Sequence, residues 1–291
     1  MELLRSLIFV PGNRPNMLER ARTFNADVIM VDLEDSVPAG EKANARKLAA
    51  EWVSELQRQG KRVMVRVNSL DTGLTREELA AVIGPHLYGV SIGKAASARD
   101  LQEVDRIITP LEAAAGLAPG QVKLIPWIEN ARAVMAAYPM ATASPRIVAI
   151  AFGAEDYTND MGVQRTDLGE EVNFPRAIVA VAARAANVAS VDTPFVGFRD
   201  PEGLRREARQ ARQLGYTGKF AIHPGQIDII NETFSPLPED VAYARQVVDA
   251  WNQAAAAGRG SVDLNGRMID VPVVKRAHSL LALAEAIELG A

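Results

Sequence analysis

In Ile147-Val-Ala-Ile-Ala-Phe-Gly153, apolar residues follow one another without a polar interruption, and this pattern is the strongest indication of the fold. A strand with one face in water alternates apolar and polar residues, whereas a strand covered on both faces is apolar throughout. The run Val28-Ile-Met-Val31 repeats this pattern near the start of the chain. Both runs predict strands of a parallel sheet whose two faces are buried.

Similar apolar runs occur along the rest of the chain, and we predict eight strands separated by segments with helical periodicity. The strands are expected at Ser6–Pro11, Val28–Glu34, Arg62–Asn68, Gly89–Lys94, Lys123–Glu129, Ile147–Gly153, Ala189–Val196 and Gly218–Ile222. The helices are expected at Glu41–Gln59, Ala98–Ala115, Phe174–Asn187 and Glu202–Leu214. This alternation is typical of an α/β fold of the (β/α)8 TIM-barrel type, which usually takes about 250 residues. A doubly wound open sheet is the competing fold, but no Gly-x-Gly-x-x-Gly follows the first strand, which favours the barrel.

The chain continues for about 65 residues beyond the eighth strand. We place the barrel domain at residues 1–235 and a C-terminal helical and hairpin extension at residues 236–291. The extension is expected to contain a helix at Asp240–Ala257, a hairpin at Ser261–Asp270 around the favoured turn Asn265-Gly266, and a last helix at Val273–Leu289. A segment of this size is too small to fold alone. It must therefore pack on its own barrel or on that of a neighbouring subunit.

The composition excludes several classes of protein. Among the 291 residues, 32 Lys and Arg stand against 36 Asp and Glu, a net charge of −4, whereas nucleic-acid binders usually carry a basic surface. The hydrophobic fraction of 48% is too high for a disordered chain. No run approaches the roughly 20 apolar residues of a membrane span, and the first residues lack the pattern of a signal peptide. We expect a soluble, cytoplasmic globular protein without nucleic-acid or membrane partners.

Metal chemistry is limited by the residues available. The chain has no cysteine and three histidines, His86, His223 and His278. Disulfides, thiolate nucleophiles and Cys-based zinc sites are therefore excluded. His223 precedes Pro224, which favours extended backbone, and we expect it to be a buried, hydrogen-bonded structural residue. A metal would then be held by carboxylates, which favours Mg2+, with Mn2+ as the alternative.

Charged side chains stand at the ends of the predicted strands, where barrel enzymes carry their chemistry. Those singled out as candidates are Arg14, Glu34, Asp35, Arg66, Lys94, Glu129 and Asp156. Glu129 and Asp156 follow apolar strands that would bury them, and an unpaired buried carboxylate is costly. A divalent cation would supply the missing charge. A salt bridge to Arg66 or Lys94 is the alternative and stays open.

The other candidates have weaker signals. Glu34 and Asp35 would hold metal-bound waters, or else cap their loop and pair with Lys42 or Arg46. The planar guanidinium of Arg66 suits a carboxylate or a developing oxyanion. Lys94 also permits a Schiff-base mechanism, although nearby carboxylates would keep its ammonium group charged. Arg14, after Gly12 and before a predicted helix, is a candidate phosphate contact.

Eight motifs in order along the chain carry a resemblance to a known family. They are Arg5-Ser-Leu-Ile-Phe-Val-Pro-Gly12, Asp32-Leu-Glu-Asp-Ser-Val-Pro38 with Lys42 and Arg46, Arg66-Val-Asn68, Ile128-Glu-Asn130, Phe152-Gly-Ala-Glu-Asp-Tyr157, Arg165-Thr166, Ala221-Ile-His-Pro-Gly-Gln-Ile227 and Gly266-Arg-Met-Ile-Asp270. From Arg5 to about Ala277, the sequence resembles the citrate lyase beta-subunit-like branch of the HpcH/HpaI aldolase superfamily, which includes malyl-CoA and citramalyl-CoA lyases.

The resemblance implies a role for each matching residue. Glu129 and Asp156 match the Mg2+ ligands, and Arg66 matches the arginine that binds the substrate on its thioester side. Positions 34 and 35, both carboxylates, match residues around the metal. Arg14 and Lys42 are candidate contacts to the CoA phosphates. Asp270 matches an aspartate that reaches from the tail of one subunit into the site of its neighbour, which implies a homo-oligomer, by family a trimer or a multiple of one.

The implied activity is Mg2+-dependent cleavage of a 3-hydroxy-3-carboxyl acyl-CoA, of the citramalyl-CoA or malyl-CoA type, to acetyl-CoA and a 2-oxo acid. Asp270 or a metal-linked water would act as the base. The alternatives are the citryl-cleaving beta subunit of a citrate lyase complex, which works with an acyl-carrier protein, a malyl-CoA-type thioesterase, and a scaffold that binds acyl-CoA. Asn130 and Gly93 depart from the usual family residues, which leaves the acyl group of the substrate open.

Overall fold

The structure, a computed structural model, describes residues 2–166, 168–256 and 258–290. These residues form two compact units. One is Leu4–Asn231, and the other combines residues 2–3 with residues 232–290. Each unit is described by itself below. The predicted domain boundary at residue 235 and the predicted contribution of the tail to a neighbouring subunit's site stay predictions.

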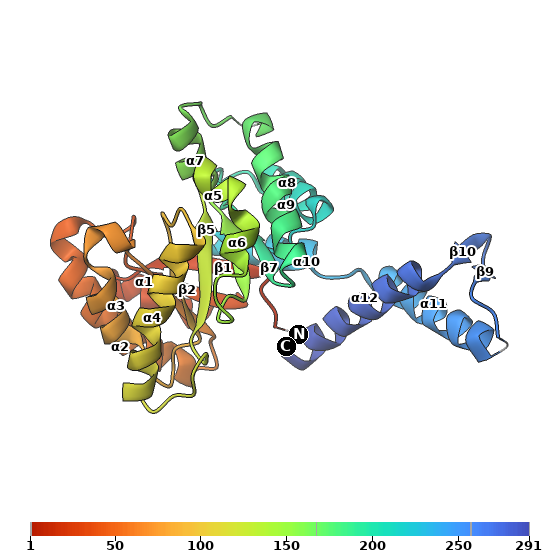
Figure 1. Cartoon of the computed structure of the whole chain (residues 1–291), viewed down its shortest axis with the longest axis horizontal. Coiled ribbons are helices and arrows are strands. Elements are labelled where there is room, and N and C mark those ends of the chain that lie inside the picture. The colour runs from red at the N-terminus through yellow and green to blue at the C-terminus, as the bar shows by residue number, and fades with distance from the viewer. Residues whose placement is uncertain (1, 167, 257, 291) are drawn as a thin grey trace. The chain divides into compact units, whose positions relative to one another are not determined.

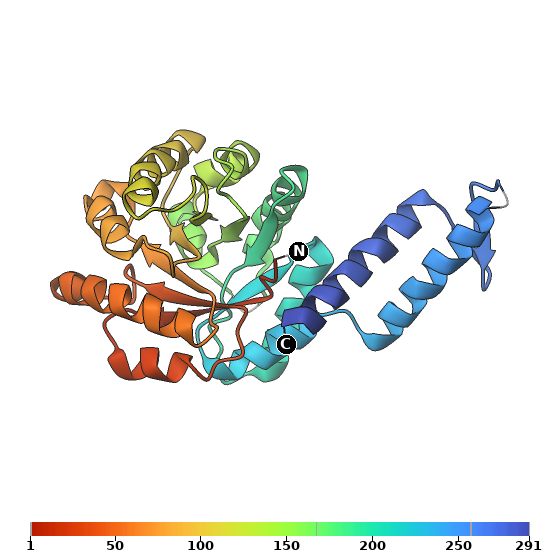
Figure 2. The ribbon, with the colours of Figure 1, turned by 90° about the horizontal axis from the view of Figure 1, so that it is seen from below.

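The first unit is a closed barrel of eight parallel strands, in which each strand pairs with the next and β8 pairs with β1 (Figures 1 and 2). The strands are β1 Ser6–Pro11, β2 Val28–Asp32, β3 Val63–Val67, β4 Gly89–Ile92, β5 Lys123–Ile128, β6 Ala149–Phe152, β7 Ala189–Asp192 and β8 Gly218–Ala221. Strands β2, β4 and β6 are buried at every position, as the apolar runs predicted. The TIM-barrel prediction is confirmed, and closure of the sheet excludes the doubly wound alternative.

Helices lie around the strands, with the longer ones on the outside of the barrel (Figure 2). They are α1 Pro15–Ala21, α2 Lys42–Arg58, α3 Thr75–Val82, α4 Ala98–Ala114, α5 Ala131–Met135, α6 Ala137–Ala141, α7 Ala154–Met161, α8 Glu170–Ala185, α9 Pro201–Leu214 and α10 Ile227–Phe234, with short 3-10 turns at Ala39–Glu41, Leu70–Thr72 and Pro224–Gln226. None of the helices in the described part of the chain is long and apolar enough to cross a membrane.

The inside of the barrel is filled by aromatic rings at the level where the strands end. Phe220 lies 5.0 Å from Phe9 and 4.5 Å from Trp127, measured between ring centroids. The Trp127 indole N–H donates a hydrogen bond of 2.9 Å to the buried Ser91 hydroxyl on β4. Rings of this size, packed against one another, close the interior like a core rather than a pore. They form an apolar floor beneath the mouth of the barrel.

The second unit contains two long helices joined by a small hairpin. Helix α11 Pro238–Ala256 and helix α12 Val271–Gly290 lie side by side (Figures 1 and 2). Between them, β9 Val262–Leu264 pairs antiparallel with β10 Arg267–Ile269. Asn265 and Gly266 form the turn with positive φ at both positions, as that residue pair predicts. Ala257, the predicted end of α11, lies outside the described residues.

Candidate active site

The candidate side chains meet at one mouth of the barrel, because parallel strands all end on the same side. Their positions follow the strand ends: Asp32, Glu34 and Asp35 at β2, Arg66 on β3, Lys94 after β4, Glu129 after β5 and Asp156 in the first turn of α7 after β6. Sequence reasoning placed all but Asp32 among the site residues. The structure brings Arg66, Glu34, Asp35 and Lys94 into direct contact.

Arg66 is held by a two-pronged pair with Asp32. Its Nε and Nη2 donate to the two Asp32 carboxylate oxygens at 2.7 and 2.8 Å. Burial would raise the pKa of Asp32, but the charge and hydrogen bonds of Arg66 outweigh burial and lower the pKa. The guanidinium carbon also lies 4.6 Å from the centre of the Phe9 ring. The hydrogen bonds to Asp32 and the contact with the Phe9 ring therefore fix the orientation of the Arg66 guanidinium.

Glu34 joins Arg66 to Lys94. One Glu34 oxygen lies 3.0 Å from Nη1 of Arg66, and the other accepts from Nζ of Lys94 at 2.8 Å. Asp35, which is exposed, accepts from the same ammonium group at 3.0 Å. The sequence-based alternative, in which the Glu34 and Asp35 carboxylates pair with Lys42 or Arg46, is wrong. Lys42 donates to the backbone oxygens of Leu33 and Glu34 and to the side chain of Asn68, and not to either carboxylate. Arg46 pairs with Glu77.

Lys94 keeps its positive charge in this arrangement. Burial lowers the pKa of Lys94, but the hydrogen bonds and charges of Glu34 and Asp35 outweigh burial and raise the pKa above its usual value. A Schiff-base lysine needs a neutral amine, and the neighbouring Glu34 and Asp35 carboxylates disfavour that form of Lys94. The backbone at Lys94 has φ 57°, an uncommon conformation for a residue with a side chain. Its backbone N–H donates to a carboxylate oxygen of Glu129.

Glu129 is buried without a counter-ion among the described residues, at 4% exposed. Burial and the charge of Asp156 raise the pKa of Glu129 to about 8. Two glycines make room for its carboxylate. A Cβ at Gly93 would lie 2.8 Å from one oxygen, and a Cβ at Gly153 would lie 2.7 Å from the other. The alternative of a salt bridge to Arg66 or Lys94 is not what the structure shows.

Asp156 lies half-buried beside Glu129 and also makes no ion pair within the described residues. Burial and the charge of Asp35 raise the pKa of Asp156. Around this mouth, five carboxyl groups lie close to only two cations, Arg66 and Lys94. No group of three or more carboxylate or histidine ligands occurs in the described part of the chain. Two carboxylate oxygens in an electronegative mouth fit Mg2+, which usually takes one or two carboxylates and completes its shell with water and substrate oxygens.

The two candidate phosphate contacts differ in their surroundings. Arg14 is exposed, and its guanidinium has no partner within the described residues. Lys42 donates to the backbone oxygens of Leu33 and Glu34, both at 2.7 Å, and to the Asn68 side chain at 2.9 Å. These three acceptors engage every N–H of the ammonium group. A phosphate at Lys42 would have to displace one of them.

Two other sequence predictions concern residues away from this cluster. Asp270 directly precedes α12 and caps it: its Oδ1 accepts from the backbone N–H of Val273 at 3.2 Å. Its role in a neighbouring site stays a prediction. His223 is hydrogen-bonded as predicted, accepting from Gly225 at 3.1 Å, but it is exposed rather than buried. It lies at the end of β8, where the strand has left the core, and stacks on Phe198.

Asp32 is the residue of the mouth that sequence reasoning missed. Its strand partner in the sheet is Arg66. In a strand, every second side chain points the same way, so Asp32 follows Val28 and Met30 on the inner face. This alternation was the available signal. A charged residue on the inward face, two positions beyond a core methionine, needs a partner inside the barrel.

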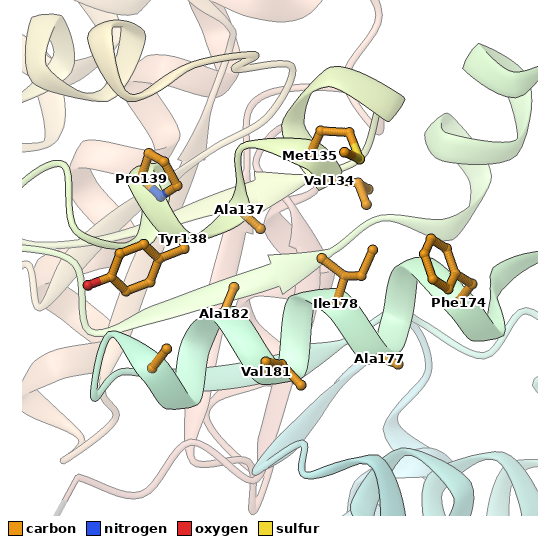
Figure 3. Close-up of a pocket in the computed structure, with 11 residues that line it drawn as sticks. Val134, Met135, Ala137, Tyr138, Pro139, Phe174, Ala177, Ile178, Val181 and Ala182 are labelled. Carbon is orange, nitrogen blue, oxygen red and sulfur yellow. The ribbon is translucent and has the colours of Figure 1, made fainter.

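An apolar groove of about 400 Å³ lies elsewhere, on the outside of the barrel between α5, α6 and α8 (Figure 3). Phe174, Ile178 and Val181 line it from α8, and Val134 and Tyr138 line it from α5 and α6. None of the residues that line it is charged. The groove therefore offers none of the groups that a carboxylated substrate or a metal needs.

Comparison with known proteins points to one family. Residues 5–224 match the family described as HpcH/HpaI aldolase/citrate lyase. The chain is similar to citrate lyase subunit beta of Leuconostoc mesenteroides subsp. cremoris, with 37% identity over 287 residues, 99% of this chain and 95% of that protein. It is also similar to L-malyl-CoA/beta-methylmalyl-CoA lyase of Cereibacter sphaeroides, with 34% identity over 304 residues, 97% of this chain and 95% of that one.

Solved structures give the same result. The crystal structure of protein CitE from Mycobacterium tuberculosis, in complex with magnesium, acetoacetate and coenzyme A, is similar with a TM-score of 0.76 and 29% identity, covering 96% of this chain and 97% of that one. A citrate lyase from Burkholderia xenovorans LB400 is similar in fold, with a TM-score of 0.86 at 21% identity over 99% of this chain and 93% of that one.

Proposed function

Because the chain belongs to the HpcH/HpaI aldolase/citrate lyase family, we propose that it is a Mg2+-dependent carbon–carbon lyase acting on a CoA thioester. Its substrate is a 3-hydroxy-3-carboxyl acyl-CoA of the citramalyl-CoA or malyl-CoA type. Cleavage by retro-Claisen or retro-aldol chemistry gives acetyl-CoA and a 2-oxo acid. The reaction breaks the bond between the carbon that bears the hydroxyl group and the carbon next to the thioester.

The observation that carries the proposal is the buried Glu129, which has no counter-ion among the described residues and lies beside Asp156. Glu129 and Asp156 would hold the Mg2+ ion, with Glu34 and Asp35 next to it. Gly93 supports this, because it leaves the space at the Glu129 carboxylate open. When bound, Mg2+ supplies positive charge to the hydroxyl and carboxylate oxygens of the substrate and lowers the pKa of the hydroxyl group.

Arg66 binds the thioester side of the substrate. Asp32 and Glu34 engage three of its five N–H groups, which leaves two for a substrate oxygen. Burial lowers the pKa of Arg66, but Asp32 and the other carboxylates raise it overall, so the guanidinium stays charged. As the C–C bond breaks, its electron pair moves to the carbon next to the thioester and onto the thioester oxygen. A fixed guanidinium stabilises this developing enolate without having to reorient.

A base must remove the proton of the substrate hydroxyl group, and we assign this role to Asp270 of a neighbouring subunit. The O–H electron pair then forms the carbonyl of the 2-oxo acid, and a proton added to the enolate completes acetyl-CoA. In support, only Oδ1 of Asp270 is hydrogen-bonded within the described residues, so Oδ2 is free to accept a proton. This assignment requires a homo-oligomer, for which a trimer or a multiple of one is the proposal. We place the enzyme in the cytoplasm, where CoA esters are made.

A second candidate is the citryl-cleaving beta subunit of a citrate lyase complex, working with an acyl-carrier protein. It is favoured by the identity of 37% with a citrate lyase beta subunit against 34% with a malyl-CoA lyase. Purification from the native source distinguishes a free-standing lyase from a subunit of a complex. A free-standing lyase purifies as an oligomer of this chain, whereas a complex subunit carries an acyl-carrier protein with it.

The experiment for the activity is mass spectrometry of the products from malyl-, citramalyl-, methylmalyl- and citryl-CoA, each with Mg2+ and with EDTA. We expect Mg2+-dependent formation of acetyl- or propionyl-CoA together with a 2-oxo acid. Free CoA with an intact hydroxy acid would instead identify a thioesterase. No turnover of any ester would favour the carrier-dependent complex, or an acyl-CoA-binding scaffold.

Mixed oligomers test the shared site. Asp270→Ala and Arg66→Ala subunits are each expected to be inactive alone. Mixing them after dissociation should restore part of the activity, because some sites then combine an intact Arg66 with an intact Asp270. No recovery in oligomers shown by native mass spectrometry to be mixed would remove the role of Asp270 in a neighbouring site.

A further inference from the structure

Four charged side chains form a buried network that the proposed reaction does not use. They are Arg176 on α8, Asp192 on β7, Glu207 on α9 and Lys219 on β8. Arg176 donates to both Asp192 oxygens at 3.0 and 2.9 Å, and Lys219 donates to Asp192 and to Glu207, both at 2.6 Å. Asp192 and Lys219 are 0% exposed and Arg176 is 1% exposed.

A network of this kind is weak evidence for stability, because apolar residues of similar volume often stabilise a protein as well as a buried ion pair. The contact between this network and the backbone of Thr193 is more informative. Nζ of Lys219 makes a third hydrogen bond, of 2.7 Å, to the backbone oxygen of Thr193. Thr193 directly follows β7 and is buried. The network therefore fixes the backbone of this residue at the mouth of the barrel.

The Thr193 hydroxyl reaches the helix that carries Asp156. Its Oγ1 accepts from the backbone N–H of Ala154, the first residue of α7, at 3.2 Å. Asp156 lies two residues further on, in the same turn, and no hydrogen bond of its own side chain within the described residues fixes it. The position of its carboxylate is therefore set by the backbone of this turn.

Helix α7 has no side-chain cap from the residue that precedes it. The first N–H groups of a helix lack partners within the helix, and a Ser, Thr, Asp or Asn before the helix usually accepts from one of them. The residue before α7 is Gly153, which has no side chain to do so. A larger residue there would collide with Glu129, because its Cβ would lie 2.7 Å from the Glu129 Cβ. The space that Glu129 needs leaves the helix without a cap of its own.

We propose that Thr193 is a positioning residue for the metal site: its hydroxyl caps α7 from the neighbouring strand, and Lys219, held by Asp192, fixes Thr193 for this task. The inference rests on the proposed function, in which Asp156 binds the metal. It gives Thr193 a role in metal affinity, although its side chain makes no hydrogen bond to Glu129 or Asp156 within the described residues.

The test compares Thr193→Val, which removes the hydroxyl group and keeps the shape, with Thr193→Ser, which keeps the hydroxyl group. The matched control is Thr158→Val, because Thr158 is also buried on α7 but bonds to the carbonyl of Ala154 in its own helix. Mn2+ affinity is measured by electron paramagnetic resonance. We expect Thr193→Val to bind Mn2+ about 10-fold more weakly, the usual size of an outer-shell effect. Thr193→Ser and Thr158→Val should stay within about threefold of wild type.

Hydrogen exchange of the metal-free protein gives a second measurement. Thr193→Val should speed exchange of the Ala154 amide by about 5–10-fold, as expected for one lost hydrogen bond, and Thr193→Ser should not. Unchanged Mn2+ affinity in folded Thr193→Val, or an equal loss in Thr158→Val, would overturn the inference. The two claims can fail separately. If wild-type protein binds no Mn2+, or if Asp156→Asn does not abolish the binding, the proposed metal site is wrong. If Ala154 exchange is unchanged in Thr193→Val, the cap is wrong.

Discussion

The guanidinium of Arg66 and the carboxylate of Asp32 face each other in register on neighbouring strands, joined by two hydrogen bonds of 2.7 and 2.8 Å. A second pair of this type, Arg5 with Asp27, lies outside the mouth and is also two-pronged. The same interaction therefore occurs within the candidate site and also away from it, at Arg5–Asp27 and at Arg176–Asp192. This repetition makes it possible to separate catalysis from stability.

Substituting Asp32→Asn should lower kcat by about 10–100-fold, because Arg66 loses the charge that fixes its orientation toward the thioester. Substituting Asp27→Asn removes the equivalent charge from Arg5 and should leave kcat within about twofold of wild type. Both variants should lose about 1–3 kcal/mol of unfolding free energy. Steady-state kinetics and thermal unfolding check the pair. Equal kcat in the two variants would show that Asp32 has no part in positioning Arg66.

The pKa of Glu129 predicts an unusual stability profile. Its pKa of about 8 in the folded, metal-free protein lies above its usual value of 4.5, so folding favours the protonated form. Below pH 4.5 the group is protonated in both states and contributes nothing to the pH dependence. Between pH 4.5 and 8 the free energy of unfolding should fall by up to about 1.4 kcal/mol per pH unit from this group.

Glu129→Gln removes this cost, since the amide has no charge to bury. The variant should therefore unfold at a higher temperature than metal-free wild type at pH 8, and the difference should shrink toward pH 4.5. Mg2+ should raise the melting temperature of wild type and leave that of the variant unchanged. Calorimetry with and without EDTA measures both effects. A variant less stable than wild type at pH 8 would contradict the description of Glu129 as a buried carboxylate without a counter-ion.

The two candidate CoA contacts should behave differently. Arg14→Ala should raise KM for the CoA ester by about 3–10-fold without changing the melting temperature, because the side chain is exposed and lacks a partner within the described residues. Lys42→Met leaves the oxygens of Leu33, Glu34 and Asn68 without their donor. It should lower the unfolding free energy by about 2–4 kcal/mol. A rise of KM in Lys42→Met with unchanged stability would instead make Lys42 a direct phosphate contact.

The space beside Glu129 can be tested with a single methyl group. Gly153→Ala places a Cβ 2.7 Å from Oε2 of Glu129, which should displace the carboxylate and weaken Mn2+ binding by at least about 10-fold. Gly84→Ala is the matched control, because nothing lies within 4 Å of its added Cβ. It should bind Mn2+ as wild type does. Retained affinity in Gly153→Ala would mean that the Glu129 carboxylate does not need this space.

The barrel could be predicted from the sequence because burial on both faces leaves a clear pattern. Strands β2 and β5 begin at their predicted first residues, Val28 and Lys123. Their predicted ends were one or two residues too long, since Glu34 and Glu129 already belong to the loops. The final helix begins at Val271, two residues before its predicted start. Asp270, which the sequence predicts as the end of the hairpin, caps this helix.

The site could be predicted only in outline. In a closed barrel all parallel strands end on the same side, so Glu129, Asp156 and Arg66 are expected at the same mouth. The alternation along β2 places Asp32 on the inner face, but its pairing with Arg66 depends on the register between two strands, which no local pattern carries. The surroundings of His223 and the hydrogen bond of Thr193 involve residues far away in sequence. His223 stacks on Phe198, and Thr193 accepts from Ala154. Such contacts form only in the folded chain.

The most direct test is turnover of the CoA ester that the product survey identifies, measured together with Mn2+ binding in wild type and in Glu129→Ala. We expect wild type treated with EDTA to be inactive, to regain full activity with Mg2+ and to bind Mn2+. Glu129→Ala should fold, bind no Mn2+ and show no turnover at any Mg2+ concentration. Full activity of wild type in EDTA, or of Glu129→Ala, would contradict a metal-dependent lyase site at Glu129 and Asp156.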